Sequence, residues 1–113
     1  MGVLEKPDWF EYPAEYRRLV DQGISCFEPW CLLHGEALTE KLDGLAQRYP
    51  DRQLMPFARR TDNDDVACWE RDMGQKIVIV HDFATPGWES RGTHPDFWSW
   101  FRQAIDDMIE FEP

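Results

Sequence analysis

The run Ile77-Val78-Ile79-Val80 restricts the possible folds of this chain most strongly. β-branched residues favour strands, and a strand without polar residues at alternate positions is typically covered on both of its faces. We therefore expect a strand over 76–83, within a sheet that has helices packed on at least one side.

Three segments are expected to form helices. The first begins at Pro13, whose missing N–H would have no partner at the first helical position, and it ends near Gly23. The second covers 37–49, where apolar residues recur at helical spacing. The third begins at Thr93, which has capping-box spacing with Asp96. Its expected apolar stripe consists of Phe97, Trp98, Phe101, Ile105, Met108 and Ile109.

The remaining segments favour strands and turns. Extended pieces are expected over 24–33, 54–59 and 66–71, and Pro56 makes the second of these an edge strand or a strand with a bulge. The segment 84–92, which contains proline and glycine, is expected to be a loop. The order of these elements predicts an α+β fold over residues 1–113: a single domain with a mainly antiparallel sheet, flanked by N-terminal and C-terminal helices.

The charge balance excludes one class of partner and favours another. Twelve Lys and Arg residues against 22 Asp and Glu residues give a formal net charge of −10. Such a chain repels phosphate backbones, so direct nucleic-acid binding is not expected. An acidic surface would speed the encounter with a basic protein partner. The plain alternative is that the charge only keeps the protein in solution.

The cysteines and the hydropathy bear on the compartment. The cysteines are Cys26, Cys31 and Cys68, an odd number, and the spacing of the first two fits no standard zinc or redox motif. No stretch approaches the roughly 20 apolar residues of a membrane span, and the N-terminal stretch does not have the pattern of a signal peptide. We therefore expect a cytoplasmic protein with reduced thiols and no membrane partner.

The search for catalytic chemistry yields no motif. The three histidines, His34, His81 and His94, have no metal-binding spacing, and the acidic run 61–65 does not continue as a calcium-binding loop. The sequence has no nucleophile elbow, P-loop or dinucleotide-binding motif. We expect no catalytic residue, metal or cofactor, and a binding module is favoured over an enzyme.

The chain is rich in tryptophan, with six residues of this type. Trp30, Trp69 and Trp98 occupy expected core positions, whereas other tryptophans fall in a tail, in a loop and off the helical stripe. These others are Trp9, Trp88 and Trp100. They either contact a partner, since aromatic residues are enriched at interfaces, or cover the edges of the domain's own core.

Several short segments together resemble the SMI1/KNR4 proteins, also called the SUKH superfamily. The segment 12–20 resembles the opening helix of that family, and 54–58 resembles its Pro-Phe-Ala strand. The segments 65–70 and 77–81 are similar to the two following strands. The closing helix is matched by 97–101, although Arg102 stands where the family typically has leucine.

The resemblance implies an α+β domain without enzymatic activity. Many bacterial members resemble immunity proteins, which bind and neutralise a cognate toxin that is often a nuclease, whereas fungal members regulate cell-wall synthesis and signalling. The family has no catalytic residues to carry over to this sequence, and its partner-binding residues vary.

Three hypotheses follow. The first is an immunity protein that binds a basic toxin domain through an acidic hairpin tip and an apolar anchor. Its candidate contact residues are Asp62, Asp64, Asp65, Glu70, Asp82, Trp88 and Trp100. The second is an intracellular adaptor or regulator with several weaker partners and no toxin. The third is a small-molecule binder or enzyme with a pocket lined by tryptophan and histidine.

Overall fold

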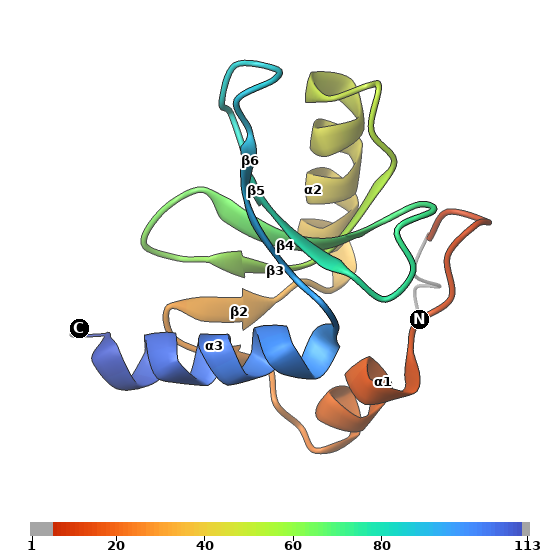
Figure 1. The fold of residues 1–113 in the computed structure, drawn as a ribbon. Helices are drawn as coiled ribbons and strands as arrows, with labels where there is room; N and C mark the ends of the chain where they lie inside the picture. Colours follow the sequence, from red (N-terminus) through yellow and green to blue (C-terminus); the bar gives the residue numbers. More distant parts are fainter. Residues whose placement is uncertain (1–5, 112–113) are drawn as a thin grey trace.

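The computed structural model describes residues 6–111, which form three helices and six strands (Figure 1). The helices are α1 (Ala14–Asp21), α2 (Gly35–Arg48) and α3 (Phe97–Glu110). The strands are β1 (Cys26–Phe27), β2 (Trp30–Leu32), β3 (Leu54–Arg60), β4 (Asp65–Glu70), β5 (Ile77–His81) and β6 (Ser90–His94).

The strands form one antiparallel sheet in which their spatial order, β1-β2-β3-β4-β5-β6, is the order along the chain. Helix α2 connects β2 to β3, and all other neighbouring strands are joined by turns or loops. This arrangement confirms the predicted α+β class with a mainly antiparallel sheet.

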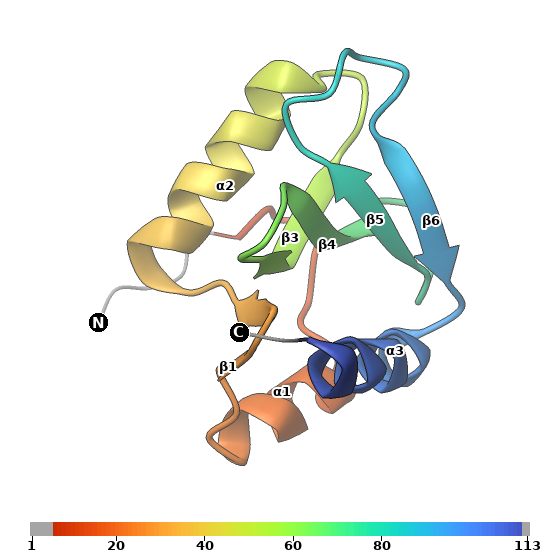
Figure 2. The ribbon, with the colours of Figure 1, turned by 90° about the vertical axis from the view of Figure 1, so that its left-hand side faces the viewer.

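The helices cover both faces of the sheet (Figure 2). On one face, Leu42 of α2 and Leu54 of β3 line a common cavity. On the other face, the ring of Phe57 in β3 lies 5.4 Å from that of Phe97 in α3, and α1 packs beside α3. The helices therefore enclose the central strands from two sides.

The run of β-branched residues in β5 is buried as predicted. Ile77, Val78 and Val80 are exposed by 0%, 4% and 0% of their surface. Since successive side chains of a strand point to opposite faces, burial of both Ile77 and Val78 requires cover on both faces. This explains why the strand has no polar alternation.

An aromatic cluster fills the space between the sheet and the pair α1 and α3. The Phe57 ring lies 4.3 Å from that of Trp69 and 4.8 Å from that of Trp100. Trp30 and Trp69 are buried as expected, and Trp98 is half-buried. The expectation for Trp100 was wrong, because it is only 1% exposed and faces the core.

The apolar face of α3 is therefore rotated from the predicted stripe. Its buried residues are Phe97, Trp100 and Ala104, whereas Met108 and Ile109 are exposed. The sheet is contacted by the first half of the helix, so the apolar residues of the last turn extend past the core.

The segment before α3 differs from the prediction. Residues 90–94 form β6, which pairs with β5, so Thr93 belongs to a strand and does not begin a helix. Asp96 caps α3 instead, and its carboxylate accepts the Ser99 N–H at 2.8 Å. The strand has no apolar alternation because it lies at the edge of the sheet with mostly exposed side chains.

Of the two alternatives that Pro56 suggested for its strand, an edge position or a bulge, one is confirmed. The register between β3 and β4 shifts between Pro56 and Ala58, which confirms the bulge alternative. The edge alternative was wrong, because β3 lies between β2 and β4. Pro56 itself pairs with Cys68, and the residue that the bulge leaves without a partner in β4 is the next one, Phe57.

The cysteine pair also differs from the prediction. Cys26 and Cys31 lie directly opposite each other in the β1–β2 hairpin and form a disulfide. Their spacing fits a two-residue turn at 28–29, with the pair placed at the open end of the hairpin. The structure thus contains this pair in its oxidised form, in contrast to the expectation of reduced thiols. Cys68 is a free, buried cysteine, and burial raises the pKa of its thiol.

Candidate partner-binding surface

Three connections between strands lie at one end of the sheet. They are the β1–β2 turn at 28–29, the β3–β4 turn at 61–64 and the β5–β6 loop at 82–89. In Figure 1 the two turns lie at the left, and the loop rises from β5 to the top of the view beside α2. We call them together the hairpin end. Because the strands form an antiparallel meander, every second connection must emerge at the same end.

Backbone hydrogen bonds join these connections to one another. The Thr61 N–H donates to the Pro29 carbonyl at 2.7 Å, and the Asp82 N–H donates to the Asp64 carbonyl at 2.9 Å. The loop 82–89 thus leaves the sheet directly beside the acidic turn 61–64. The two connections that carry most of the predicted contact residues are neighbours.

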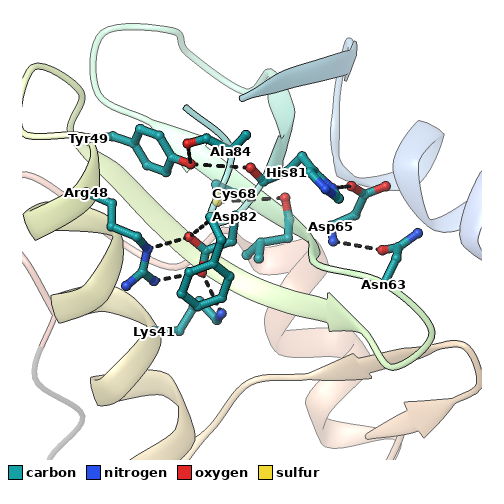
Figure 3. Close-up of polar contacts among 11 residues, drawn as sticks. Lys41, Arg48, Tyr49, Asn63, Asp65, Cys68, His81, Asp82 and Ala84 are labelled. Atoms are coloured by element: carbon teal, nitrogen blue, oxygen red, sulfur yellow. Dashed lines mark hydrogen bonds and ion pairs between the residues drawn. The ribbon is translucent and has the colours of Figure 1, made fainter. Parts of the chain in front are cut away.

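Asp82 fixes the start of the loop from inside the molecule (Figure 3). Its side chain is completely buried, and both of its oxygens accept hydrogen bonds from α2. Lys41 Nζ donates to Oδ2 at 2.7 Å, and Arg48 donates to both oxygens at 2.7 Å. The Phe83 N–H adds a bond of 2.8 Å to Oδ1. Asp82 therefore ties the loop to α2.

These contacts also set the charge of Asp82. Burial by itself raises the pKa of this carboxyl, but the hydrogen bonds from Arg48, Lys41 and the Phe83 N–H outweigh it, and the pKa lies below its usual range. The carboxylate is thus ionised and fully paired. As a buried residue it presents no atom to a partner, so its expected role as a contact residue is corrected to that of a support for the loop.

A second set of bonds fixes the rest of the loop. The Tyr49 hydroxyl donates to the Ala84 carbonyl at 2.8 Å (Figure 3). The buried carboxylate of Glu89 accepts the Gly87 N–H at 2.7 Å and a hydrogen bond from Arg52 at 3.0 Å. The loop is therefore held near both ends, and its backbone needs little further ordering when a partner binds.

Two large aromatic side chains point outward from this fixed loop. Trp88 is 80% exposed and Phe83 is 63% exposed. Phe83 has a φ of 66°, a left-handed conformation that costs a bulky residue about 1–3 kcal/mol. Its ring lies over two cations, 4.2 Å from the guanidinium of Arg48 and 5.3 Å from the ammonium of Lys41. Such exposed aromatics are the side chains most often central to protein interfaces.

Sequence reasoning found Trp88 but not Phe83. We expected Phe83 to be the last residue of the β5 strand, whereas that strand ends at His81. The available signal was the acidic residue followed by Phe83 at the start of a segment rich in turn-forming residues. Hydrophobic periodicity does not separate such a residue from the preceding apolar run.

The carboxylates in and next to the acidic turn differ in how freely each could pair with a charge on a partner. Asp62 binds Arg60 through both oxygens at 2.9 Å, and this contact lowers the pKa of the Asp62 carboxyl. Asp65 is partly buried and lies 2.8 Å from Nδ1 of His81 (Figure 3). Within residues 6–111, exposed Asp64 has no ion pair. Its charge is the one of the three most available to a partner.

The last two candidate residues lie elsewhere. Glu70 is at the end of β4 away from the turn, where it binds Arg52 at 2.8 and 2.9 Å. Through Arg52 it supports Glu89 of the loop. Trp100 is buried under the sheet and offers no surface, so its expected contact role is also corrected. The structure thus places the turn with Asp62, Asp64 and Asp65 next to the start of the loop that carries Phe83 and Trp88.

Metal-ligating side chains do not gather in the described part of the chain. Among residues 6–111, no three His, Cys, Asp or Glu side chains are placed to hold one ion. Within the same residues, no helix has both the length and the apolar character needed to span a membrane.

The fold and the loop surface define an α+β domain that presents ordered aromatic side chains beside an acidic turn. No family model matches the chain, and no curated protein or solved structure matches it. The resemblance to the SMI1/KNR4 proteins therefore stays a prediction from short motifs.

Proposed function

We propose that this domain is a non-enzymatic protein-binding module of the immunity type, which binds and neutralises a basic toxin domain such as a nuclease. One observation carries the proposal: the loop 82–89 is fixed by hydrogen bonds to buried and half-buried side chains, yet it presents Trp88 to solvent. A loop of the fold alone needs no such exposed side chain.

Physical arguments support a tight interaction at this surface. Binding normally costs free energy for ordering loops, and a loop that is already ordered avoids much of that cost. Tryptophan is among the residues with the largest contributions to interfaces. The net charge of −10 and the neighbouring acidic turn would speed the encounter with a basic partner.

Affinity capture from the native lysate at low and high salt tests this proposal. We expect one basic polypeptide, captured in near-stoichiometric amount and retained at high salt, because salt screens long-range attraction far more than contacts of buried aromatics. That polypeptide should be toxic when expressed alone and harmless when expressed with this domain. Many partners that are all lost at high salt would contradict the proposal and favour the adaptor or regulator hypothesis.

Charge reversal at the acidic turn should slow association. We expect Asp62→Lys combined with Asp64→Lys to lower the association rate roughly three- to tenfold at low ionic strength, and to weaken its dependence on salt. Stopped-flow or surface-binding kinetics with the captured partner measure both quantities. Asp21→Lys, at the exposed end of α1, is the matched control. Equal rates for the wild type and the double variant would show that this turn does not face the partner.

We also propose that the domain acts in the cytoplasm, where thiols are kept reduced. The Cys26–Cys31 disulfide provides the test, because Cys26 is exposed and exposed disulfides are the more readily reduced ones. Alkylation in intact cells before lysis should label both cysteines, whereas the purified, air-oxidised protein should leave both unlabelled. Protection of both cysteines in intact cells would contradict a cytoplasmic location.

A further inference from the structure

A cavity of about 460 Å³ opens between α1 and β2, away from the loop 82–89. Its size lies within the range of about 300–1,000 Å³ that is common for small-molecule sites. The lining is mostly apolar. Its larger members are Tyr12, Tyr16, Val20, Ile24, Leu32 and Leu33. We call this cavity the α1 pocket.

The walls of the α1 pocket are held by backbone hydrogen bonds. The Ile24 N–H donates to the Leu19 carbonyl at 3.3 Å, and the Leu32 N–H donates to the Ser25 carbonyl at 2.7 Å. Leu32 and Leu33 are also buried against the core. The pocket is therefore preformed and does not require a helix to move before a molecule can enter.

Tyr16 supplies a polar group inside this apolar lining. Its side chain is only 9% exposed, and its ring stacks on that of Tyr12 with the centroids 5.1 Å apart. Among residues 6–111, no side-chain or backbone group forms a hydrogen bond with the Tyr16 hydroxyl, although its position is fixed by Phe57 and Trp69. Within the described residues, Trp100 Nε1 is the only fully buried side-chain N or O atom without a partner, so the Tyr16 hydroxyl reaches solvent at the pocket and is free to bond to a ligand.

The Tyr16 hydroxyl acts as a donor at neutral pH. Burial, and to a lesser extent the neighbouring Tyr12, raises its pKa to about 12. Burial also raises the pKa of Tyr12. Both hydroxyls therefore keep their protons, and each can donate a hydrogen bond to an acceptor atom of a ligand such as a carbonyl oxygen.

The charges at the rim of the α1 pocket favour an uncharged ligand. Arg17 and Asp21 contribute one charge of each sign. An anion would also be repelled by the net charge of −10, and a cation would lose its hydration against an apolar lining. The remaining class is a neutral molecule with an apolar body.

We propose that the α1 pocket binds a small, uncharged and largely apolar molecule with a carbonyl oxygen that accepts a hydrogen bond from Tyr16. The α1 pocket is separate from the hairpin end. The result of a ligand-binding test at this pocket therefore does not bear on the proposed protein-binding function. The pocket is lined by tyrosine and one histidine, in contrast to the tryptophan and histidine pocket expected from the sequence.

The probe for this proposal is 6-propionyl-2-(dimethylamino)naphthalene, a neutral naphthyl ketone with a fluorescence maximum that shifts to the blue in apolar surroundings. Titration into the full chain should give a saturable blue shift with one site per chain. Backbone amide NMR shifts should change at Ile24, Leu32 and Leu33. A fluorescence shift that does not saturate, or NMR shift changes confined to other segments, would overturn the proposal. Both measurements use the wild-type protein.

Two variants locate the probe within the pocket. Val20→Trp should abolish binding because it fills the pocket from α1, and Met108→Trp is the matched control, an exposed aliphatic residue of α3. Tyr16→Phe should weaken binding about fivefold through the loss of one hydrogen bond, without loss of stability, because its hydroxyl has no protein partner. Equal affinity of wild type and Val20→Trp would overturn the site. Tighter binding of the anionic 1-anilinonaphthalene-8-sulfonate than of the ketone would overturn the ligand class.

Discussion

Replacement of Asp82 by alanine should lower the free energy of unfolding by about 3 kcal/mol. Removal of one partner from a buried ion pair typically costs about 3–5 kcal/mol, because the remaining charge is left unpaired. The side chains of Lys41 and Arg48 are 19% and 30% exposed, so each regains part of its hydration, which places the effect at the low end of that range. Urea denaturation measures the change.

The control for this variant is Asp64→Ala, which removes an exposed carboxylate of the neighbouring turn. We expect it to change stability by less than about 0.5 kcal/mol. A loss below about 1 kcal/mol for Asp82→Ala would show that Asp82 does not hold the loop to α2. The variant should also speed hydrogen exchange in the loop 82–89 while the central strands stay protected.

The pH dependence follows from the same contacts. The pKa of Asp82 in the folded state lies below its ordinary value, so the contribution of this group is fully present above the ordinary value of about 4. This contribution to stability is lost as the pH falls below the ordinary pKa and through the lowered one, because the Asp82 carboxylate of the folded protein then becomes protonated. Asp82→Asn should remove this part of the acid destabilisation, and a set of urea curves below pH 5 measures it.

Replacement of Trp88 by alanine should have the largest effect on binding. A central tryptophan of an interface contributes about 2–4 kcal/mol, which corresponds to a roughly 30- to 1,000-fold increase in Kd for the captured partner. Since Trp88 is 80% exposed in the free domain, stability should change by less than about 0.5 kcal/mol. Isothermal calorimetry with the partner measures the affinity.

Ile109→Ala is the matched control for Trp88→Ala, because Ile109 is an apolar residue of α3 that is 71% exposed. It should leave the affinity unchanged. A Trp88→Ala variant that binds as tightly as the wild type would place the interface elsewhere. The double variant with Phe83→Ala then tests whether the second aromatic residue of the loop contributes to the same contact.

The architecture could be predicted where side-chain periodicity is set by burial. The run 77–80 predicted a strand covered on both faces, and helical spacing placed the first two helices within two residues of their observed limits. Both features depend on local patterns. The final strand was missed because an edge strand such as β6 has exposed side chains on both faces and thus no apolar period.

The site was less predictable because it depends on contacts between distant residues. Asp82 and Glu89 look like surface residues in the sequence, yet cations from α2 and from the segment before β3 pair with them inside the protein. Trp100 falls off the expected stripe, yet the angle at which α3 meets the sheet turns it into the core. Asp62, Asp64 and Trp88 lie in exposed connections as expected, because these segments have clear turn chemistry, whereas Asp65 begins β4.

Hydrogen–deuterium exchange of the domain with and without its captured partner tests the central claim most directly, because it maps the contact surface without any substitution. We predict that the partner protects the amides of 61–64 and 82–89, while the exposed turns of α1 and the last turn of α3 exchange as in the free domain. Protection confined to α1 or α3, with unchanged exchange in both connections of the hairpin end, would contradict the account.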